Sequence, residues 1–112
     1  MSKSQLKLKN EVVTVSSAGT AVRAKSSTHH TWNVVIQAKN SNTGLIYVGN
    51  DGADDISSTE GFQLAAGQSL NLNAELFFSS HVEYVDLSKI WIDADTSGSS
   101  VVVMYSVTNE LL

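Results

Sequence analysis

The chain has 112 residues, which is enough for one domain with a single core. It contains no cysteine, so disulfide bridges, thiolate metal sites and cysteine nucleophiles are excluded. Charged residues make up only 16% of the sequence, below the roughly 25% of ordinary domains, and the net charge of -4 disfavours direct nucleic-acid binding. The composition suggests a polar, weakly charged, extended-structure protein and does not by itself suggest an enzyme.

The first ten residues, MSKSQLKLKN, indicate an extended basic arm that precedes a single domain over residues 11–112. Lysines stand where a secretory signal peptide needs an apolar stretch, so we expect synthesis in the cytoplasm. Leu6 and Leu8 alternate with Lys7 and Lys9 and would share one face of an extended chain. Two leucines cannot offset the ordering entropy of the arm. We expect it to be a frayed tail, or to add a strand to a partner's sheet edge.

Alternating apolar and polar residues predict strands along the rest of the chain. In chain order the expected strands are residues 11–16, 20–25, 31–39, 45–49, 62–64, 68–76, 82–85, 88–95 and 100–107. In the third, Trp32, Val34, Ile36 and Ala38 fall on one face. No segment has an apolar helical stripe, and the longest aliphatic run, residues 101–104, is far too short to cross a membrane.

Turn sequences rich in Gly, Asn and Asp separate these strands, at residues 18–19, 41–44, 50–52, 66–67 and 96–98. Glycine readily adopts positive φ, and Asn and Asp hydrogen-bond their own backbone. Many short strands with closely spaced turns predict an all-β sandwich or barrel.

Charge is divided unevenly along the chain. Residues 1–39 hold six basic residues and one acid, for +5, whereas residues 40–112 hold one base and ten acids, for -9. Such asymmetry is typical of an interaction surface. Either the two segments pair within one monomer, or the basic arm docks on an acidic partner such as a neighbouring copy.

Residues 50–60 form an acidic segment that is long for a hairpin turn, where a small β protein would carry a binding loop. Asp51, Asp54 and Asp55 offer the hard oxygen ligands that Ca²⁺ prefers, but their spacing does not match an EF-hand loop. We favour a solvated acidic loop over a cation or glycan site.

Other candidate groups lack a selective spacing. Asp93 and Asp95 share one strand face and could hold a cation, or lie on a solvated or subunit-facing surface. His29 and His30 would point to opposite faces of an extended chain, and His81 is distant, so we expect no metal site. The many serines lack a nucleophile-elbow sequence. We expect no catalysis and no cofactor.

Several expected strands are apolar on both faces, which indicates cover on both sides, whereas one small sandwich has a single interior. Trp91, for example, lies opposite the Ile90 and Ile92 face. Trp91 would then be buried in a subunit interface, or else be an exposed platform for carbohydrate. Val35 is likewise an apolar residue on the strand face opposite the expected core. The candidate interface residues are Leu6, Leu8, Trp91, Val102 and Met104.

Four segments occur together with a closing Met104-Tyr105: residues 35–38 (VIQA), 42–49 (NTGLIYVG), 61–70 (GFQLAAGQSL) and 86–94 (DLSKIWIDA). In this combination residues 34–107 resemble small virion proteins of tailed bacteriophages, described as decoration, cement, tail or fibre components. The resemblance implies a jelly-roll-like antiparallel β-sandwich of about seven to nine strands, often trimeric, without catalysis. It supplies no residue-level site.

We therefore expect a structural virion protein, a homotrimeric decoration or cement protein that stabilises the head by binding its outer surface. Its partners would be itself and the major capsid protein or another virion protein, with no direct nucleic-acid or membrane contact. Ser, Thr and Asn suit such a role because they hydrogen-bond at interfaces without the desolvation of charge. The alternative is a tail or fibre-associated module for host recognition, binding carbohydrate or using Ca²⁺.

Overall fold

A computed structural model describes residues 4–50, 52, 61–73 and 84–110. Its described part contains ten strands and one short 3₁₀ helix, and all strand pairs are antiparallel. The expectation of an all-β sandwich is confirmed. The described residues include no helix of sufficient length and hydropathy to span a membrane.

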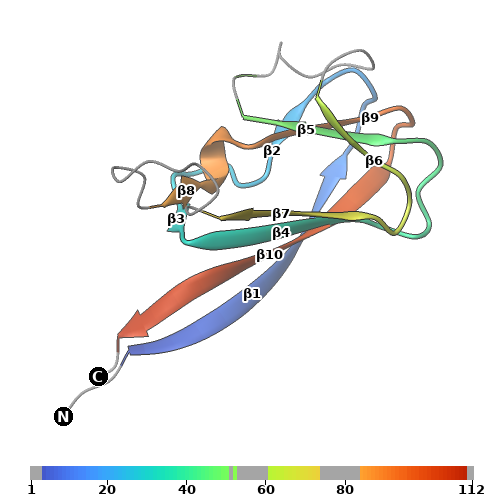
Figure 1. Cartoon of the computed structure of the whole chain (residues 1–112). Helices are drawn as coiled ribbons and strands as arrows, with labels where there is room; N and C mark the ends of the chain where they lie inside the picture. Colours follow the sequence, from blue (N-terminus) through green and yellow to red (C-terminus); the bar gives the residue numbers. More distant parts are fainter. Residues whose placement is uncertain (1–3, 51, 53–60, 74–83, 111–112) are drawn as a thin grey trace.

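The first sheet contains the two longest strands of the described part. Its order is β1 (Ser4–Val15), β10 (Ser99–Glu110), β4 (Asn33–Ala38) and β7 (Ser69–Asn73). β1 and β10 pair over their full lengths, from Ser4 opposite Glu110 to Val15 opposite Ser99. They form a long two-stranded ribbon that extends beyond β4 and β7 (Figure 1).

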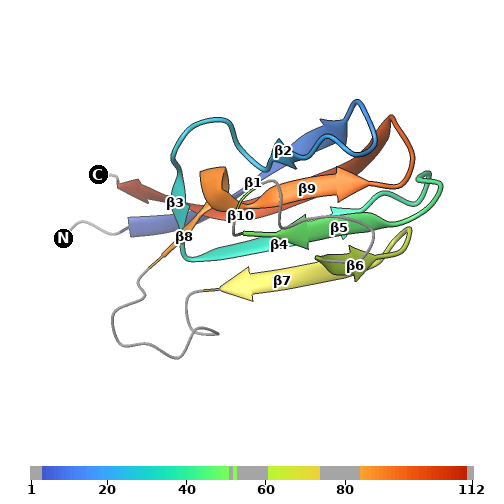
Figure 2. The same cartoon turned by 90° about the horizontal axis from the view of Figure 1, so that it is seen from above.

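The second sheet packs over the inner face of the first (Figure 2). Its order is β2 (Val22–Arg23), β9 (Trp91–Ala94), β5 (Ile46–Gly49) and β6 (Phe62–Leu64). A small third sheet pairs β3 (His30–Thr31) with β8 (Val85–Asp86). The 3₁₀ helix η3 (Leu87–Lys89) joins β8 to β9.

The core lies between the two larger sheets, because every second residue of their strands points inward. On β10, Val101, Val103 and Tyr105 are buried, and the residues between Val101 and Tyr105 on the other face are half-buried. The largest fully buried side chains are Val15, Val34, Ile36, Ile46, Leu64, Leu87, Ile90, Ile92, Val101, Val103 and Tyr105. The predicted period-2 pattern thus separates core from surface in β4 and in the middle of β10, whereas β5 and β9 each bury three consecutive residues.

One expected core residue, Trp32, is instead 53% exposed. The chain bends at this residue between β3 and β4, so Trp32 does not share the face of Val34. Thr31 is buried, and its hydroxyl contacts the Ser106 carbonyl oxygen at 2.8 Å and the Asn33 carbonyl oxygen at 3.0 Å. The side chain of Thr31 therefore satisfies backbone groups where the alternation is interrupted.

One segment prediction also needs correction. The strand expected over residues 88–95 begins only at Trp91, since residues 87–89 form η3. The carboxylate of Asp86 accepts hydrogen bonds from the Ser88 backbone N–H and hydroxyl, which stabilises this turn locally. The strand expected over residues 68–76 is β7, and its last three residues lie outside the described part of the chain.

The basic arm expected over residues 1–10 is not a separate segment in its described part. β1 runs without a break from Ser4 through Asn10 to Val15 and pairs with β10 of the same chain. β4 pairs with β10 only as far as Tyr105, and β1 continues beside β10 to Glu110. Hydrogen bonds of the β1–β10 ladder order the arm. The expected alternatives were a frayed tail or pairing with a partner molecule, and neither included a partner strand within the same chain.

Candidate functional site

The predicted interface residues lie on opposite sides of the sandwich. Leu8, Val102 and Met104 lie in the first sheet on the face turned away from the core, and Trp91 lies on the outer side of the second sheet. Leu6 lies in β1, opposite Thr108. The five residues therefore do not form one continuous face of the chain.

The outer face of the first sheet carries a cluster of apolar side chains, here called the outer apolar patch. Strand register places Val12 opposite Val102, and Met104 opposite Val35. Leu8 and Val12 are 57% and 56% exposed, whereas the other members are half-buried. The patch consists of Leu8, Val12, Val35, Val102 and Met104. Contiguous apolar surface of this kind is typical of contacts with another protein.

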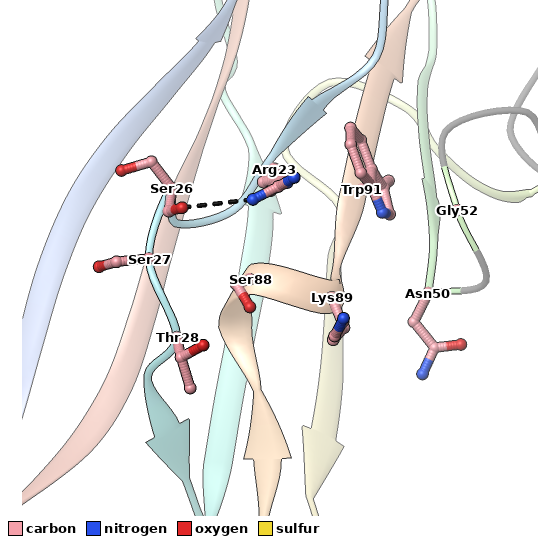
Figure 3. Close-up of a pocket in the computed structure, with 9 residues that line it drawn as sticks. All are labelled: Arg23, Ser26, Ser27, Thr28, Asn50, Gly52, Ser88, Lys89 and Trp91. Carbon is pink, nitrogen blue, oxygen red and sulfur yellow. Dashed lines mark hydrogen bonds between the residues drawn. The ribbon is translucent and has the colours of Figure 1, made fainter.

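A second candidate site is a polar pocket of about 620 Å³ on the second sheet. It is lined by Arg23, Ser26, Ser27, Thr28, Asn50, Gly52, Ser88, Lys89 and Trp91. Figure 3 shows Arg23 of β2 beside Trp91 of β9, with Ser26 and Ser27 on the segment that follows β2. Ser88 lies on η3, and Asn50 lies on the far side. Hydroxyl, amide and cationic groups thus surround one aromatic ring.

The pairing of β2 with β9 builds this pocket, because it places Arg23 directly opposite Trp91. The Arg23 guanidinium carbon lies 5.2 Å from the centre of the Trp91 ring, within the range of a cation–π contact. Arg23 also donates a 3.3 Å hydrogen bond to the Ser26 carbonyl oxygen. The charged residues among the described lining, Arg23 and Lys89, are both cationic, so these two side chains favour a neutral or anionic ligand.

A polar cluster closes the side of the sandwich between β1 and the segment after β2. The Glu11 carboxylate accepts hydrogen bonds from the Tyr105 hydroxyl at 2.8 Å and from the Lys25 ammonium at 3.2 Å. These donors, Tyr105 first, hold the pKa of Glu11 below its ordinary value, and the same contact raises the pKa of Lys25. Burial, and then Glu11, raises the pKa of Tyr105. Tyr105 and Lys25 therefore both hold the Glu11 carboxylate in place through hydrogen bonds.

Asp93 and Asp95 serve as hydrogen-bond acceptors for the protein itself. Asp93 is buried, and one of its oxygens accepts from the Gly19 backbone N–H at 3.0 Å. Asp95 accepts from the Tyr47 hydroxyl at 2.6 Å and the Leu45 backbone N–H at 2.9 Å, which together lower its pKa. The hydrogen bond to Asp95 also raises the pKa of Tyr47. Both carboxylates stabilise turns and strand ends.

The two adjacent histidines have different aromatic neighbours. The His29 ring meets Tyr105 edge-on at 4.9 Å, and the His30 ring stacks on Tyr84 at 3.8 Å. In the part of the chain that the structure describes, no three His, Asp or Glu residues come together as a metal site. His81 and the predicted loop residues Asp51, Asp54 and Asp55 lie outside the described residues.

Sequence reasoning identified Trp91 but missed the groups around it. Arg23, Lys89 and the hydroxyl-bearing residues come from segments that are far apart in the chain. The only sequence signal was that Arg23 follows Val22 in an expected strand, and the partner strand could not be inferred from that alternation. The outer apolar patch was easier to predict, because strands with apolar residues on both faces show it within a single segment.

Comparison with known proteins finds no family model that matches the chain and no curated protein sequence that is similar to it.

Proposed function

We propose that this protein is a structural component of a tailed bacteriophage virion, a homo-oligomeric decoration or cement protein that binds the outer surface of the head. The observation that supports this role best is the outer apolar patch, where Leu8 and Val12 expose more than half of their surface. A face of this kind gains stability when another protein covers it. The partners would be a further copy of the chain and the major capsid protein.

The strand orders support the jelly-roll architecture that the resemblance implies. Eight strands divide into the orders β1-β10-β4-β7 and β2-β9-β5-β6, so consecutive strands repeatedly change sheet. Two four-stranded sheets connected in this way are characteristic of jelly rolls. The fold alone does not carry the role, since one architecture serves many functions.

The location can be tested on tailed phage particles produced from a genome that encodes this chain. Antibodies raised against the purified protein should label the heads of intact particles in immunogold electron microscopy. Particles from which the gene is deleted provide the control and should remain unlabelled. Absence of the protein from purified wild-type particles would overturn the virion role, and labelling of tails alone would move the protein from the head to the tail.

The binding face can be tested by adding purified protein back to particles that lack it. Met104→Lys places a charge in the outer apolar patch and should abolish binding, since an interface must then desolvate that charge. Gln63→Lys is the matched control, because Gln63 is exposed on β6 of the opposite sheet. If both variants bind like wild type, the outer apolar patch is not the docking face.

The pocket at Trp91 favours a second function, recognition of a sugar. An indole ring surrounded by hydroxyl and amide groups suits a polyhydroxylated ring, and Arg23 and Lys89 favour an acidic one. A glycan array followed by titration of tryptophan fluorescence tests this function. Trp91→Ala should abolish binding, while Trp32→Ala, at an exposed tryptophan elsewhere, should leave it unchanged. No glycan binding by the wild-type chain would remove this candidate.

A further inference from the structure

β1 is a twelve-residue strand at the edge of the first sheet. Among the described residues, β10 is its only strand partner, and no backbone hydrogen bond joins residues 7–13 to any other segment. In an antiparallel sheet, alternate backbone N–H and C=O groups of an edge strand point away from its partner. Such an edge is a template for a further strand unless the protein blocks it.

The side chains in the middle of β1 form a self-complementary sequence, Leu-Lys-Asn-Glu-Val. Leu8 and Val12 are exposed on the outer face of the sheet, with Asn10 between them. Lys9 and Glu11 alternate with these residues and lie on the other face, where Lys9 is exposed and the Glu11 side chain is 31% exposed. An apolar pair and an opposite-charge pair are therefore both arranged symmetrically about Asn10.

Two copies of β1 paired about a twofold axis perpendicular to the sheet must place like faces together, so the axis lies at a residue. A twofold axis at Leu8, Lys9 or Glu11 would place like-charged residues of the two copies opposite each other. An axis at Val12 leaves Glu11 opposite a valine. An axis at Asn10 places Leu8 opposite Val12 twice and Lys9 opposite Glu11 twice, and cross-strand pairs of both kinds stabilise a sheet.

We infer that the β1 edges of two copies pair antiparallel about a twofold axis at Asn10. The two four-stranded sheets then form one continuous eight-stranded sheet. On its outer face, Leu8 of the second copy packs beside Val12, which itself lies opposite Val102 on β10. The contact extends the outer apolar patch across both copies and places its two most exposed members, Leu8 and Val12, side by side. A trimer would need a different, threefold contact.

The absence of cysteine from the sequence allows a direct test of the register in the full-length chain. Opposed residues of an antiparallel pair have Cα atoms about 4.5–5.5 Å apart, within the range that a disulfide bridges. Asn10→Cys should therefore form a disulfide-linked dimer under mild oxidation. Val12→Cys is the matched control on the same face, because the two copies of this residue would be offset by about 13 Å along the strands.

Light scattering supplies the second measurement. The wild-type protein should have twice the 12.0 kDa mass of the chain. Lys9→Glu places an acid opposite Glu11 in both symmetry-related pairs. It should therefore raise the dissociation constant of the dimer at least tenfold. Lys39→Glu, in the turn after β4, is a charge-matched control and should leave the dissociation constant unchanged.

A monomeric wild type, or Asn10→Cys linking no faster than Val12→Cys, would overturn this pairing. A mass of three chains without a link in Asn10→Cys would also overturn it, while leaving the virion role intact. A linked dimer together with unlabelled phage particles would keep the pairing and remove the virion role. The two proposals therefore fail separately.

Discussion

The Tyr105 hydroxyl donates a 2.8 Å hydrogen bond to the Glu11 carboxylate, which joins the buried face of β10 to the edge strand β1. Glu11 lies opposite Val103 in the ladder, so this contact crosses the pair diagonally. Lys25 reaches the same carboxylate oxygen from the segment after β2. One carboxylate thus connects both sheets at the side of the sandwich.

Tyr105→Phe should lower the free energy of unfolding by about 1 kcal/mol, the usual net contribution of one hydrogen bond. The ring still fills the core, and Lys25 still pairs with Glu11, so the fold should persist. Urea unfolding at pH 7 measures the change. Tyr84→Phe is the control, because Tyr84 is half-exposed, and its variant should remain within about 0.5 kcal/mol of wild type. Equal effects of the two substitutions would contradict a structural role for the Tyr105 hydroxyl.

Stability should fall in acid because Glu11, Asp86 and Asp95 have pKa values below their ordinary values of 4.5, 3.8 and 3.8. For Asp86, burial opposes the shift, and hydrogen bonds from Ser88 and His29 outweigh it. A carboxyl group with a lowered folded pKa contributes stability above its unfolded pKa, and loses it as pH falls through the folded value.

The free energy of unfolding should therefore change little from pH 7 to about 5 through these groups, and decrease steadily below about 4.5. Glu11→Gln removes one of the three groups and should make the acid dependence shallower. Urea unfolding across a pH series measures both slopes. An identical slope in Glu11→Gln would show that Glu11 is not linked to folding.

Adjacent valines on β10 provide a matched test of which face is buried. Val103 is 1% exposed, and Val102 is half-buried on the outer face. Val103→Ala should cost about 2 kcal/mol, from the lost transfer free energy and the remaining cavity. Val102→Ala should cost less than half as much in the monomer. Thermal and urea unfolding of both variants measure the two losses of stability. A larger loss in Val102→Ala than in Val103→Ala would contradict this assignment.

Gly44 is constrained both by its backbone and by a neighbour. Its φ is +84°, and a Cβ atom added there would lie 2.8 Å from the Cβ of Asp95. Gly98 has a similar φ of +90° with no atom within 4 Å of such a Cβ. Gly44→Ala should therefore destabilise the fold by more than Gly98→Ala, which carries only the strain of positive φ, about 1 kcal/mol. Comparable unfolding midpoints would show that the Asp95 turn yields to the added methyl group.

The sequence allowed prediction of the all-β class and of the buried face wherever a strand alternates strictly, as in Ile36 and Val103. It failed where side chains compete with the alternation. The hydroxyl of Thr31 satisfies backbone groups at a bend and leaves Trp32 outside, and Asp86 nucleates a helical turn where a strand was expected. Such hydrogen bonds depend on neighbours that hydrophobic periodicity does not describe.

The candidate sites show the same division. Val102 and Met104 were predicted from their own strand, since an apolar residue between core positions must find cover elsewhere. The pocket could not be predicted, because Arg23 and Trp91 meet only through the pairing of β2 with β9. That pairing is decided by the packing of the whole sandwich rather than by either short segment.

The pairing of the first strand with the last has a consequence for biosynthesis. Ser4 lies opposite Glu110, so β1 can complete its ladder only after the residues through Glu110 have been synthesised and have left the ribosome. Until then, the core-facing side chain of Val15 and both edges of β1 are exposed in the nascent chain. Non-local strand pairing of this kind is slow and leaves unpaired edges open to aggregation. The sandwich should therefore fold only after β10 has left the ribosome. Heavy expression should favour chaperone binding or aggregation through the unpaired β1 strand until then.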